Sequence, residues 1–187
     1  MIESLYDMVK HWSCGGSVYI ISDTHFDDPQ CKEVDPDWPS PKEHVALIRK
    51  YVTPFDTLIH LGDVGNPEYM DQIPCYKILV MGNHDRISDC ASHFDEVFDG
   101  PLYISKKLLL SHEKVYAKGA VNIHGHHHCD KPGLIVDENR ESATVNMASD
   151  VCRYIPMNLG TAIKQGLSSV VKDIHRITID NARLRSE

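Results

Sequence analysis

The sequence predicts an α/β fold, and three observations carry this prediction. Short apolar runs of strand length recur along the chain, and the segments between them include helical patterns. A chain of 187 residues is long enough for one well-filled domain and short for two. Strands that alternate with helices are typical of α/β architecture. We therefore expect residues 1–187 to form a single domain, with residues 1–16 as an N-terminal extension.

Each predicted element has its own signal in the sequence. Residues 40–52 predict a helix, because Ser40 can cap it, a proline follows at the first helical position, and apolar residues recur at helical spacing. Residues 158–173 predict a second helix that two glycines weaken, and 174–182 predict a final short strand. The remaining strands are predicted from apolar runs that each end in a polar cluster, at 17–25, 56–63, 76–85, 106–113, 120–128 and 142–150.

Composition excludes several classes of protein. The net charge of -8 comes without a block of lysine or arginine, which argues against a stable nucleic-acid complex. No apolar run approaches the ~20 residues of a membrane span, and the N-terminus does not resemble a secretory signal. The six cysteines are scattered without a C-x-x-C pair, which favours reduced thiols. We therefore expect a cytoplasmic protein without a membrane partner.

Polar side chains repeatedly follow the predicted strands, at the edge where α/β sheets bind ligands. The sequence reads D-T-H after the first strand, G-D after the second, G-N-H-D after the third and G-H-H-H near position 126. If residues 126–128 are extended, the outer two histidines face one side and His127 faces the other. The candidate metal ligands are Asp23, His25, Asp63, Asn83, His112, His126 and His128.

These residue types indicate the kind of metal. Aspartate, asparagine and histidine together suit Mn²⁺, Fe or Zn²⁺ better than Ca²⁺, which prefers an all-oxygen shell. Seven side chains are more than one ion needs. With one shared carboxylate they supply four ligands to each of two ions, and the sequence therefore predicts a two-metal hydrolase.

The motifs D-x-H, G-D, G-N-H-D, a single histidine and G-H-x-H, in this order over residues 23–128, resemble the calcineurin-like metallophosphoesterase family. The small bacterial and phage-encoded members are the most similar. The resemblance implies two facing mixed β-sheets flanked by helices, and hydrolysis of phosphodiester or phosphomonoester bonds by a hydroxide that bridges two divalent ions. Mn²⁺ is the expected metal, with Fe or Zn²⁺ as alternatives.

The resemblance also implies a role for each matching residue. His84 would stand beside the scissile phosphate as general acid or as a positively charged stabiliser, since imidazole is the side chain that hands over a proton near neutrality. Asp85 would support the loop. Arg86 and His127 are further candidates for substrate contact. Asp63 would bridge both ions. The other ligands would divide into Asp23, His25 and His128 for the first metal, and Asn83, His112 and His126 for the second.

The sequence leaves the natural substrate and two alternative classes of protein open. The second motif reads "GDVGNPEYM" and lacks the arginine typical of phosphoprotein phosphatases, so a small phosphate ester or a nucleotide is the favoured substrate. One alternative is a catalytically idle member of the family that serves as a scaffold for protein binding. Another is the metallo-β-lactamase pattern H-x-H-x-D-H, which the chain matches at Asp130 but not at Lys131. The sequence gives no indication of the oligomeric state.

Overall fold

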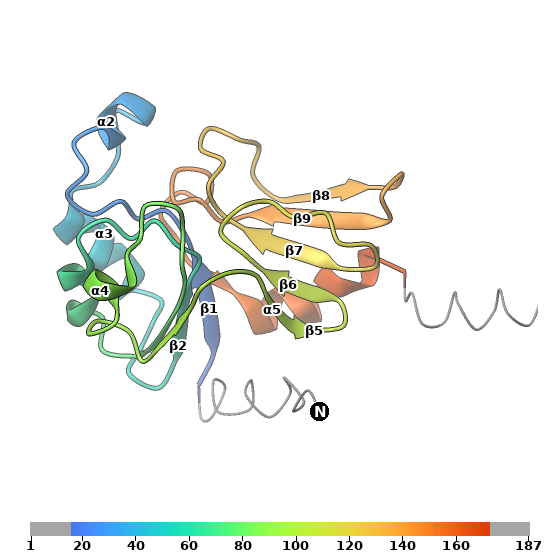
Figure 1. Ribbon diagram of the computed structural model, residues 1–187, viewed down its shortest axis with the longest axis horizontal. Helices are drawn as coiled ribbons and strands as arrows, with labels where there is room; N and C mark the ends of the chain where they lie inside the picture. Colours follow the sequence, from blue (N-terminus) through green and yellow to red (C-terminus); the bar gives the residue numbers. More distant parts are fainter. Residues whose placement is uncertain (1–15, 173–187) are drawn as a thin grey trace, which may run out of the picture.

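Two five-stranded β-sheets face each other in the computed structural model, which describes residues 16–172 (Figure 1). The first sheet has the order β10-β1-β2-β3-β4, in which β1 to β4 are parallel and β10 is antiparallel to β1. Its strands are β1 (Val18–Ile21), β2 (Thr57–His60), β3 (Tyr76–Val80), β4 (Glu96–Phe98) and β10 (Met157–Asn158).

The second sheet is also mixed. Its order is β5-β6-β7-β9-β8, with β6, β7 and β9 parallel and the two edge strands antiparallel to their neighbours. Its strands are β5 (Leu102–Ser105), β6 (Leu108–Leu110), β7 (Val121–His124), β8 (Leu134–Asp137) and β9 (Ser142–Asn146). Because the central strands of both sheets are parallel, the loops that follow them emerge on a common side, where ligands bind in sheets of this kind.

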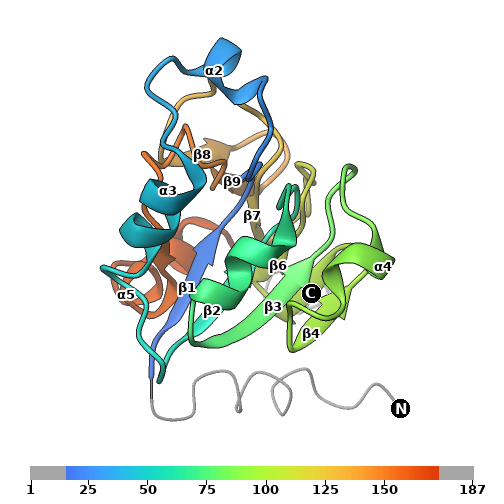
Figure 2. The same ribbon diagram turned by 90° about the vertical axis from the view of Figure 1, so that its left-hand side faces the viewer.

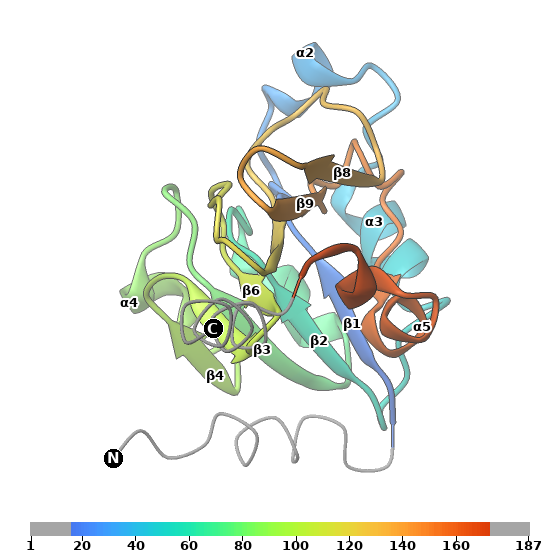
Figure 3. The same cartoon turned by 90° about the vertical axis from the view of Figure 1, so that its right-hand side faces the viewer.

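The helices are short and lie mainly beside the first sheet. Figure 2 shows α3 and α4 on its outer face, and Figure 3 shows α5 near β1. The helical segments are α2 (Cys31–Val34), α3 (Pro41–Ile48), α4 (Ile87–Cys90), α5 (Leu159–Lys164) and the 3₁₀ turns η1 (Pro67–Gln72) and η2 (Leu167–Val170). The predicted sandwich of two facing mixed sheets is confirmed, with few flanking helices in the described part of the chain.

Alternation along the strands builds two apolar cores. In β1 and β3, Ile20 and Ile78 point between the sheets, whereas their neighbours Ile21 and Leu79 point toward the helices. All four side chains are fully buried. A strand that is buried on both faces reads as a continuous apolar run, which explains why the sequence signals for β1, β2 and β3 are strong.

The predicted helix at 40–52 is present as α3 and ends earlier, at Ile48. The Ser40 side chain accepts from the Glu43 amide while the Glu43 carboxylate accepts from the Ser40 amide, which forms a capping box. The helix predicted at 158–173 is wrong as a single element. It breaks at Gly166, whose φ of 94° is left-handed, so that α5 and η2 are separate.

The condition for the alternation argument, an extended segment at 126–128, is not met. Strand β7 ends at His124, and His126 has a left-handed φ of 67°. The segment forms a turn instead. The His127 amide donates a hydrogen bond to the Gly125 carbonyl (2.8 Å), and the His128 amide donates one to the His126 carbonyl (3.2 Å). The final strand predicted at 174–182 and most of the extension at 1–16 lie outside the described residues.

Candidate metal centre

Five loops meet at the ends of the parallel strands and bring the predicted ligands together. Each loop follows a different strand, which is why residues far apart in the sequence become neighbours. Asp23 and His25 follow β1, Asp63 follows β2, Asn83 and His84 follow β3, His112 follows β6, and His126 and His128 follow β7.

The backbone at this centre is strained at four of the predicted ligands. Asp23, His25, Asp63 and His126 have φ angles of 55°, 42°, 55° and 67°, in the left-handed region that side chains other than glycine rarely adopt. Hydrogen bonds between neighbouring loops hold this conformation, including those from the Asp23 amide to the Gly62 carbonyl (2.9 Å) and from the His25 amide to the Asp63 carbonyl (3.1 Å). Strain of this kind persists where the surrounding structure over-determines the backbone.

Two motif glycines are required because the loops pass so close to one another. A Cβ on Gly62 would lie 2.3 Å from the Gly82 nitrogen. A Cβ on Gly125 would lie 2.0 Å from the Ser22 hydroxyl oxygen and 2.2 Å from Asp23 Oδ2. The glycines that precede Asp63 and His126 in the sequence therefore let the loops approach until their side chains meet.

The Asp85 carboxylate ties two of these loops together. It accepts hydrogen bonds from the backbone amides of Asp63 (2.9 Å), Val64 (3.0 Å) and Gly82 (2.8 Å). These bonds fix the turn on which Asp63 sits. Asp85 thus holds the two loops together through three backbone amides.

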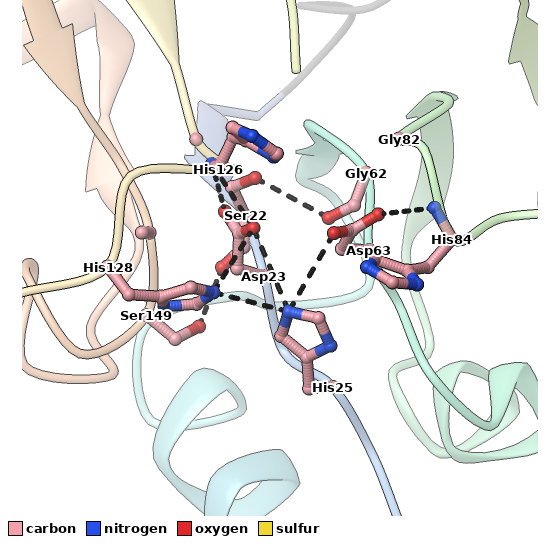
Figure 4. A network of polar contacts seen from close by, with 12 residues as sticks. Ser22, Asp23, His25, Gly62, Asp63, Gly82, His84, His126, His128 and Ser149 are labelled. Carbon is pink, nitrogen blue, oxygen red and sulfur yellow. Dashed lines mark hydrogen bonds and ion pairs between the residues drawn. The ribbon is translucent and has the colours of Figure 1, made fainter. Parts of the chain in front are cut away.

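The first cluster consists of Asp23, His25 and His128 (Figure 4). One ligand atom from each lies within 4.8 Å of the other two. Asp23 Oδ1 is 3.9 Å from His25 Nε2 and 3.8 Å from His128 Nε2, and the two nitrogens are 3.3 Å apart. The two contacts to Asp23 are too long for hydrogen bonds. Two ligands at about 2.1 Å from one ion lie roughly 3–4 Å apart, so the spacing fits a shared cation.

The second cluster consists of Asp63, His112 and His126, again with ligand atoms within 4.8 Å of one another. His112 Nε2 is 3.4 Å from Asp63 Oδ2 and 3.0 Å from His126 Nδ1. The Asn83 side-chain oxygen adds a fourth candidate, 2.9 Å from His112 Nε2. The second set of predicted ligands thus converges in the same way as the first.

One carboxylate oxygen lies between the two clusters. Asp63 Oδ2 is 3.8 Å from His25 Nε2 of the first cluster and 3.4 Å from His112 Nε2 of the second. The other oxygen, Oδ1, accepts from the His84 backbone amide at 3.0 Å. Asp63 is therefore placed to contribute to both clusters.

A further carboxylate, Asp150, was not among the sequence predictions. It accepts from His128 Nδ1 at 2.8 Å and from the Cys129 amide at 2.7 Å, which leaves His128 Nε2 facing the first cluster. Asp28 occupies a comparable position behind His25, with Oδ2 at 3.7 Å from Nδ1. Asp150 follows the apolar strand β9, so the pattern of a polar residue after a strand end contained the signal that could have found it.

Burial and hydrogen bonds shift the pKa values of these groups. Burial raises the pKa of Asp23 and lowers that of His25. Burial would also raise the pKa of Asp63, but the hydrogen bonds from His112 and from the His84 amide lower it to about 2. The hydrogen bond to Asp150 raises the pKa of His128. A bound cation would favour ionised carboxylates and neutral imidazoles at all of these positions.

A pocket of about 200 Å³ is lined by four of the predicted ligands, namely His25, Asp63, His126 and His128. His84 lines the pocket, and its ring centroid lies 6.0 Å from that of His25.

Arg86 and His127 are exposed and are not among the described residues that line this pocket. The His127 ring packs edge-on between two histidines, at 5.4 Å between centroids from His126 and 5.7 Å from His124. A larger hollow of about 430 Å³, between β8 and η2, contains none of the predicted site residues.

Comparison with known proteins places the chain in a family. The calcineurin-like phosphoesterase superfamily domain matches residues 17–146, and the chain belongs to this superfamily. Among solved structures, it is similar to a protein of unknown function from Aquifex aeolicus, with 25% sequence identity and a TM-score of 0.67, over 80% of this chain and 98% of the other. A comparison with curated proteins finds no match.

Two features outside the centre bear on the sequence expectations. No helix within residues 16–172 is long and apolar enough to cross a membrane. The cysteines in the described part of the chain are free thiols, namely Cys31, Cys75, Cys90, Cys129 and Cys152.

Proposed function

We propose that this protein is a phosphoesterase that hydrolyses phosphodiester or phosphomonoester bonds with two divalent metal ions. The position of Asp63 Oδ2 carries the proposal, because this oxygen lies 3.8 Å from a nitrogen of one cluster and 3.4 Å from a nitrogen of the other. A shared carboxylate holds two ions a few ångströms apart, which is the arrangement used for in-line displacement at phosphorus.

The proposal assigns every predicted ligand to an ion. The first ion would be held by Asp23, His25 and His128, and the second by Asn83, His112 and His126, while Asp63 would contribute to both. The fit rests on the converging atoms of the two clusters and on their donor types, since imidazole nitrogens and carboxylate or amide oxygens are ligands of Mn²⁺, Fe and Zn²⁺.

The two ions, when bound, would lower the pKa of a water molecule and neutralise charge on the phosphoryl oxygens. The chain itself supplies the remaining parts. Asp63 fixes the spacing between the two metal sites. Its side chain also accepts a hydrogen bond from the His84 backbone amide (3.0 Å), which fixes the position of His84. The His84 side chain lines the pocket and acts as general acid toward the leaving oxygen. Asp85 holds the loops and does not touch substrate.

We propose Mn²⁺ as the activating metal, with Fe or Zn²⁺ as alternatives. The centre contains no thiolate in the first or second cluster, although Cys129 follows His128 directly. The Cys129 sulfur points toward the Val34 carbonyl (3.9 Å), so it does not provide the soft ligand that would favour Zn²⁺ over Mn²⁺.

The experiment is a screen of chromogenic phosphate mono- and diesters, with the purified protein stripped of metal and then supplied with Mn²⁺, Fe²⁺ or Zn²⁺. We expect hydrolysis that depends on metal and two metal equivalents per chain. Asp63→Ala serves as the negative control. A protein that binds two ions and hydrolyses none of the esters would instead support the scaffold alternative, and one that binds no metal would contradict the whole proposal.

A further inference from the structure

We infer that the site selects phosphoesters whose phosphate is attached to an uncharged, apolar group, and that it discriminates against substrates with additional anionic groups. The inference rests on the proposed function. It comes from one wall of the pocket, which we call the selectivity wall: Asp28, Gln30, Cys31, Val34 and Trp38. These residues lie on the segment 28–38, which includes α2, whereas the rest of the pocket lining consists of predicted metal ligands and His84.

The charge on this wall is negative. Among the described residues that line the pocket there is no lysine or arginine, and Asp28 is the charged residue of the wall. Its carboxylate is held in place by the Gln30 amide, which donates to Oδ1 at 2.8 Å. The surrounding stretch adds further acidic residues, namely Asp27, Glu33, Asp35 and Asp37. A second anionic group on a substrate would therefore lie against like charge.

The one cation of this stretch faces elsewhere. Lys32 Nζ donates to the backbone carbonyls of Pro36 (3.1 Å) and Trp38. Lys32 lines a separate hollow, together with Glu43, and does not line the pocket over the predicted ligands. Lys32 therefore gives no charge compensation to a substrate bound over the metal clusters.

Beside Asp28, the wall presents apolar side chains to the pocket, and Trp38 among them is held rigidly. Trp38 is only 4% exposed, and its ring lies 6.3 Å from His25 and 5.8 Å from His128. Tyr154 packs edge-on against Trp38 at 5.3 Å, and its hydroxyl donates to the Asp35 carboxylate. Val34 is the more accessible apolar side chain, at 37% exposure. A fixed, apolar surface of this kind favours a compact apolar group over a hydrated anion.

Charge at the metal centre sharpens this selection. Two divalent ions, when bound, would compensate the charge of the two buried aspartates, Asp23 and Asp63, and would leave enough positive charge for about one phosphate group. Nucleoside polyphosphates and acidic phosphopeptides carry further negative charge that this pocket does not neutralise. The substrate class that fits is a phosphate ester of a small apolar alcohol or phenol.

The test compares two esters of similar shape, 4-carbamoylphenyl phosphate and 4-carboxyphenyl phosphate, of which only the second carries an additional negative charge, with the Mn²⁺-loaded wild-type protein. The carboxylate also raises the pKa of the leaving phenol, so the salt dependence of the rate ratio identifies the part that comes from charge. We expect kcat/KM to be about tenfold higher for the amide at low ionic strength, and the difference to shrink as salt is added. Equal rates, or a preference for the carboxylate, would overturn the inference.

Variants at Val34 test whether the selectivity wall causes the discrimination between the two esters, because Val34 lies on the wall and is not a predicted metal ligand. Val34→Lys should reduce the discrimination to about threefold or less by adding a cation to the wall. Val34→Met controls for side-chain size, and Val136→Lys controls for the added charge at an exposed position on β8; both should keep the wild-type ratio. If Val34→Lys leaves the ratio unchanged, the wall does not determine the selectivity.

Failure of the proposed function gives a different result. If neither ester is hydrolysed although metal is bound, the phosphoesterase proposal fails. Isothermal titration with 4-carbamoylphenylphosphonate and 4-carboxyphenylphosphonate then still measures the charge preference, because these analogues need only to bind. Tighter binding of the amide analogue would support the selectivity inference by itself, and equal binding would contradict it.

Discussion

The two ligand clusters look alike in composition but differ in what stands behind their histidines. In the first cluster, a carboxylate lies near the Nδ1 atom of each histidine, which is the ring nitrogen that faces away from the cluster. Asp150 Oδ1 is 2.8 Å from His128 Nδ1, and Asp28 Oδ2 is 3.7 Å from His25 Nδ1. In the second, His112 donates its outward Nδ1–H to the neutral Leu61 carbonyl at 2.8 Å. The second cluster also takes a neutral amide, Asn83, as its fourth candidate ligand.

This difference teaches that the two candidate metal sites are not equivalent. A carboxylate that accepts from a ligating imidazole fixes the ring and increases the basicity of the nitrogen that faces the metal. The first cluster also carries more negative charge around it. We therefore expect the first cluster to fill at lower metal concentration, whereas the second depends more strongly on the shared Asp63.

The largest effect is expected from removing the ligand that the clusters share. Asp63→Ala should lower the metal content of both sites and reduce the esterase rate by more than about 10³-fold, since metal stabilisation of the phosphoryl oxygens is worth several kcal/mol. Metal analysis and steady-state kinetics measure the two effects. Retention of both ions at full occupancy would show that Asp63 is not a bridge. Circular dichroism checks that the variant folds.

Removing one outer histidine should separate the clusters. His128→Ala is expected to weaken the first ion and His126→Ala the second, and each should lower the rate by about 10²-fold or more, because the remaining ligands no longer close the coordination shell. His127→Ala is the matched control. His127 belongs to neither cluster, although its ring centroid lies 5.4 Å from that of His126, so the metal content of this variant should be unchanged and its rate should fall by less than about threefold. Metal loss in His127→Ala alone would contradict this assignment.

His84→Ala distinguishes proton transfer from metal binding. His84 belongs to neither cluster, so both ions should remain bound while the rate falls by about 10²–10⁴-fold. The loss should be smaller for esters with good leaving groups, which need less help from an acid. A variant that loses its metals would place His84 among the ligands instead.

The smallest expected effect is on metal affinity, and it tests most directly whether the two clusters differ. Asp150→Asn keeps the shape of the side chain but removes the charge behind His128, and it should weaken the first ion by about 10–100-fold without affecting the second. Asp71→Asn is the control, because Asp71 also accepts from a histidine, His93 at 3.0 Å, on an exposed surface away from the centre. Two-step metal titration by calorimetry measures both. Equal weakening of the two steps would remove the distinction between the clusters.

The sequence predicted the centre better than it predicted the local backbone. The strands β1, β2 and β3 are buried on both faces, so their apolar runs and the polar residues after them were visible directly. The left-handed φ angles at Asp23, His25 and His126 were not predictable, because side chains other than glycine rarely adopt them and only contacts between distant loops hold them.

Other features were missed because the strands are short or because the residue depends on a partner far away in the sequence. The strands β4, β8 and β10 have two to four residues and depend on pairing with strands elsewhere in the chain. Asp150 was missed because its role depends on a hydrogen bond to His128, 22 residues earlier in the sequence. Neither kind of feature leaves a periodic pattern in its own segment.

The central claim is that two ions share Asp63 and that the first cluster binds more tightly. Crystals soaked in Mn²⁺ at one equivalent and at saturation, measured near the manganese absorption edge, locate the ions directly. We expect one anomalous peak among Asp23, His25 and His128 at one equivalent. At saturation, a second peak should appear between His112 and His126, with both peaks adjacent to Asp63 Oδ2. A single peak at saturation, or a first peak in the second cluster, would contradict the account.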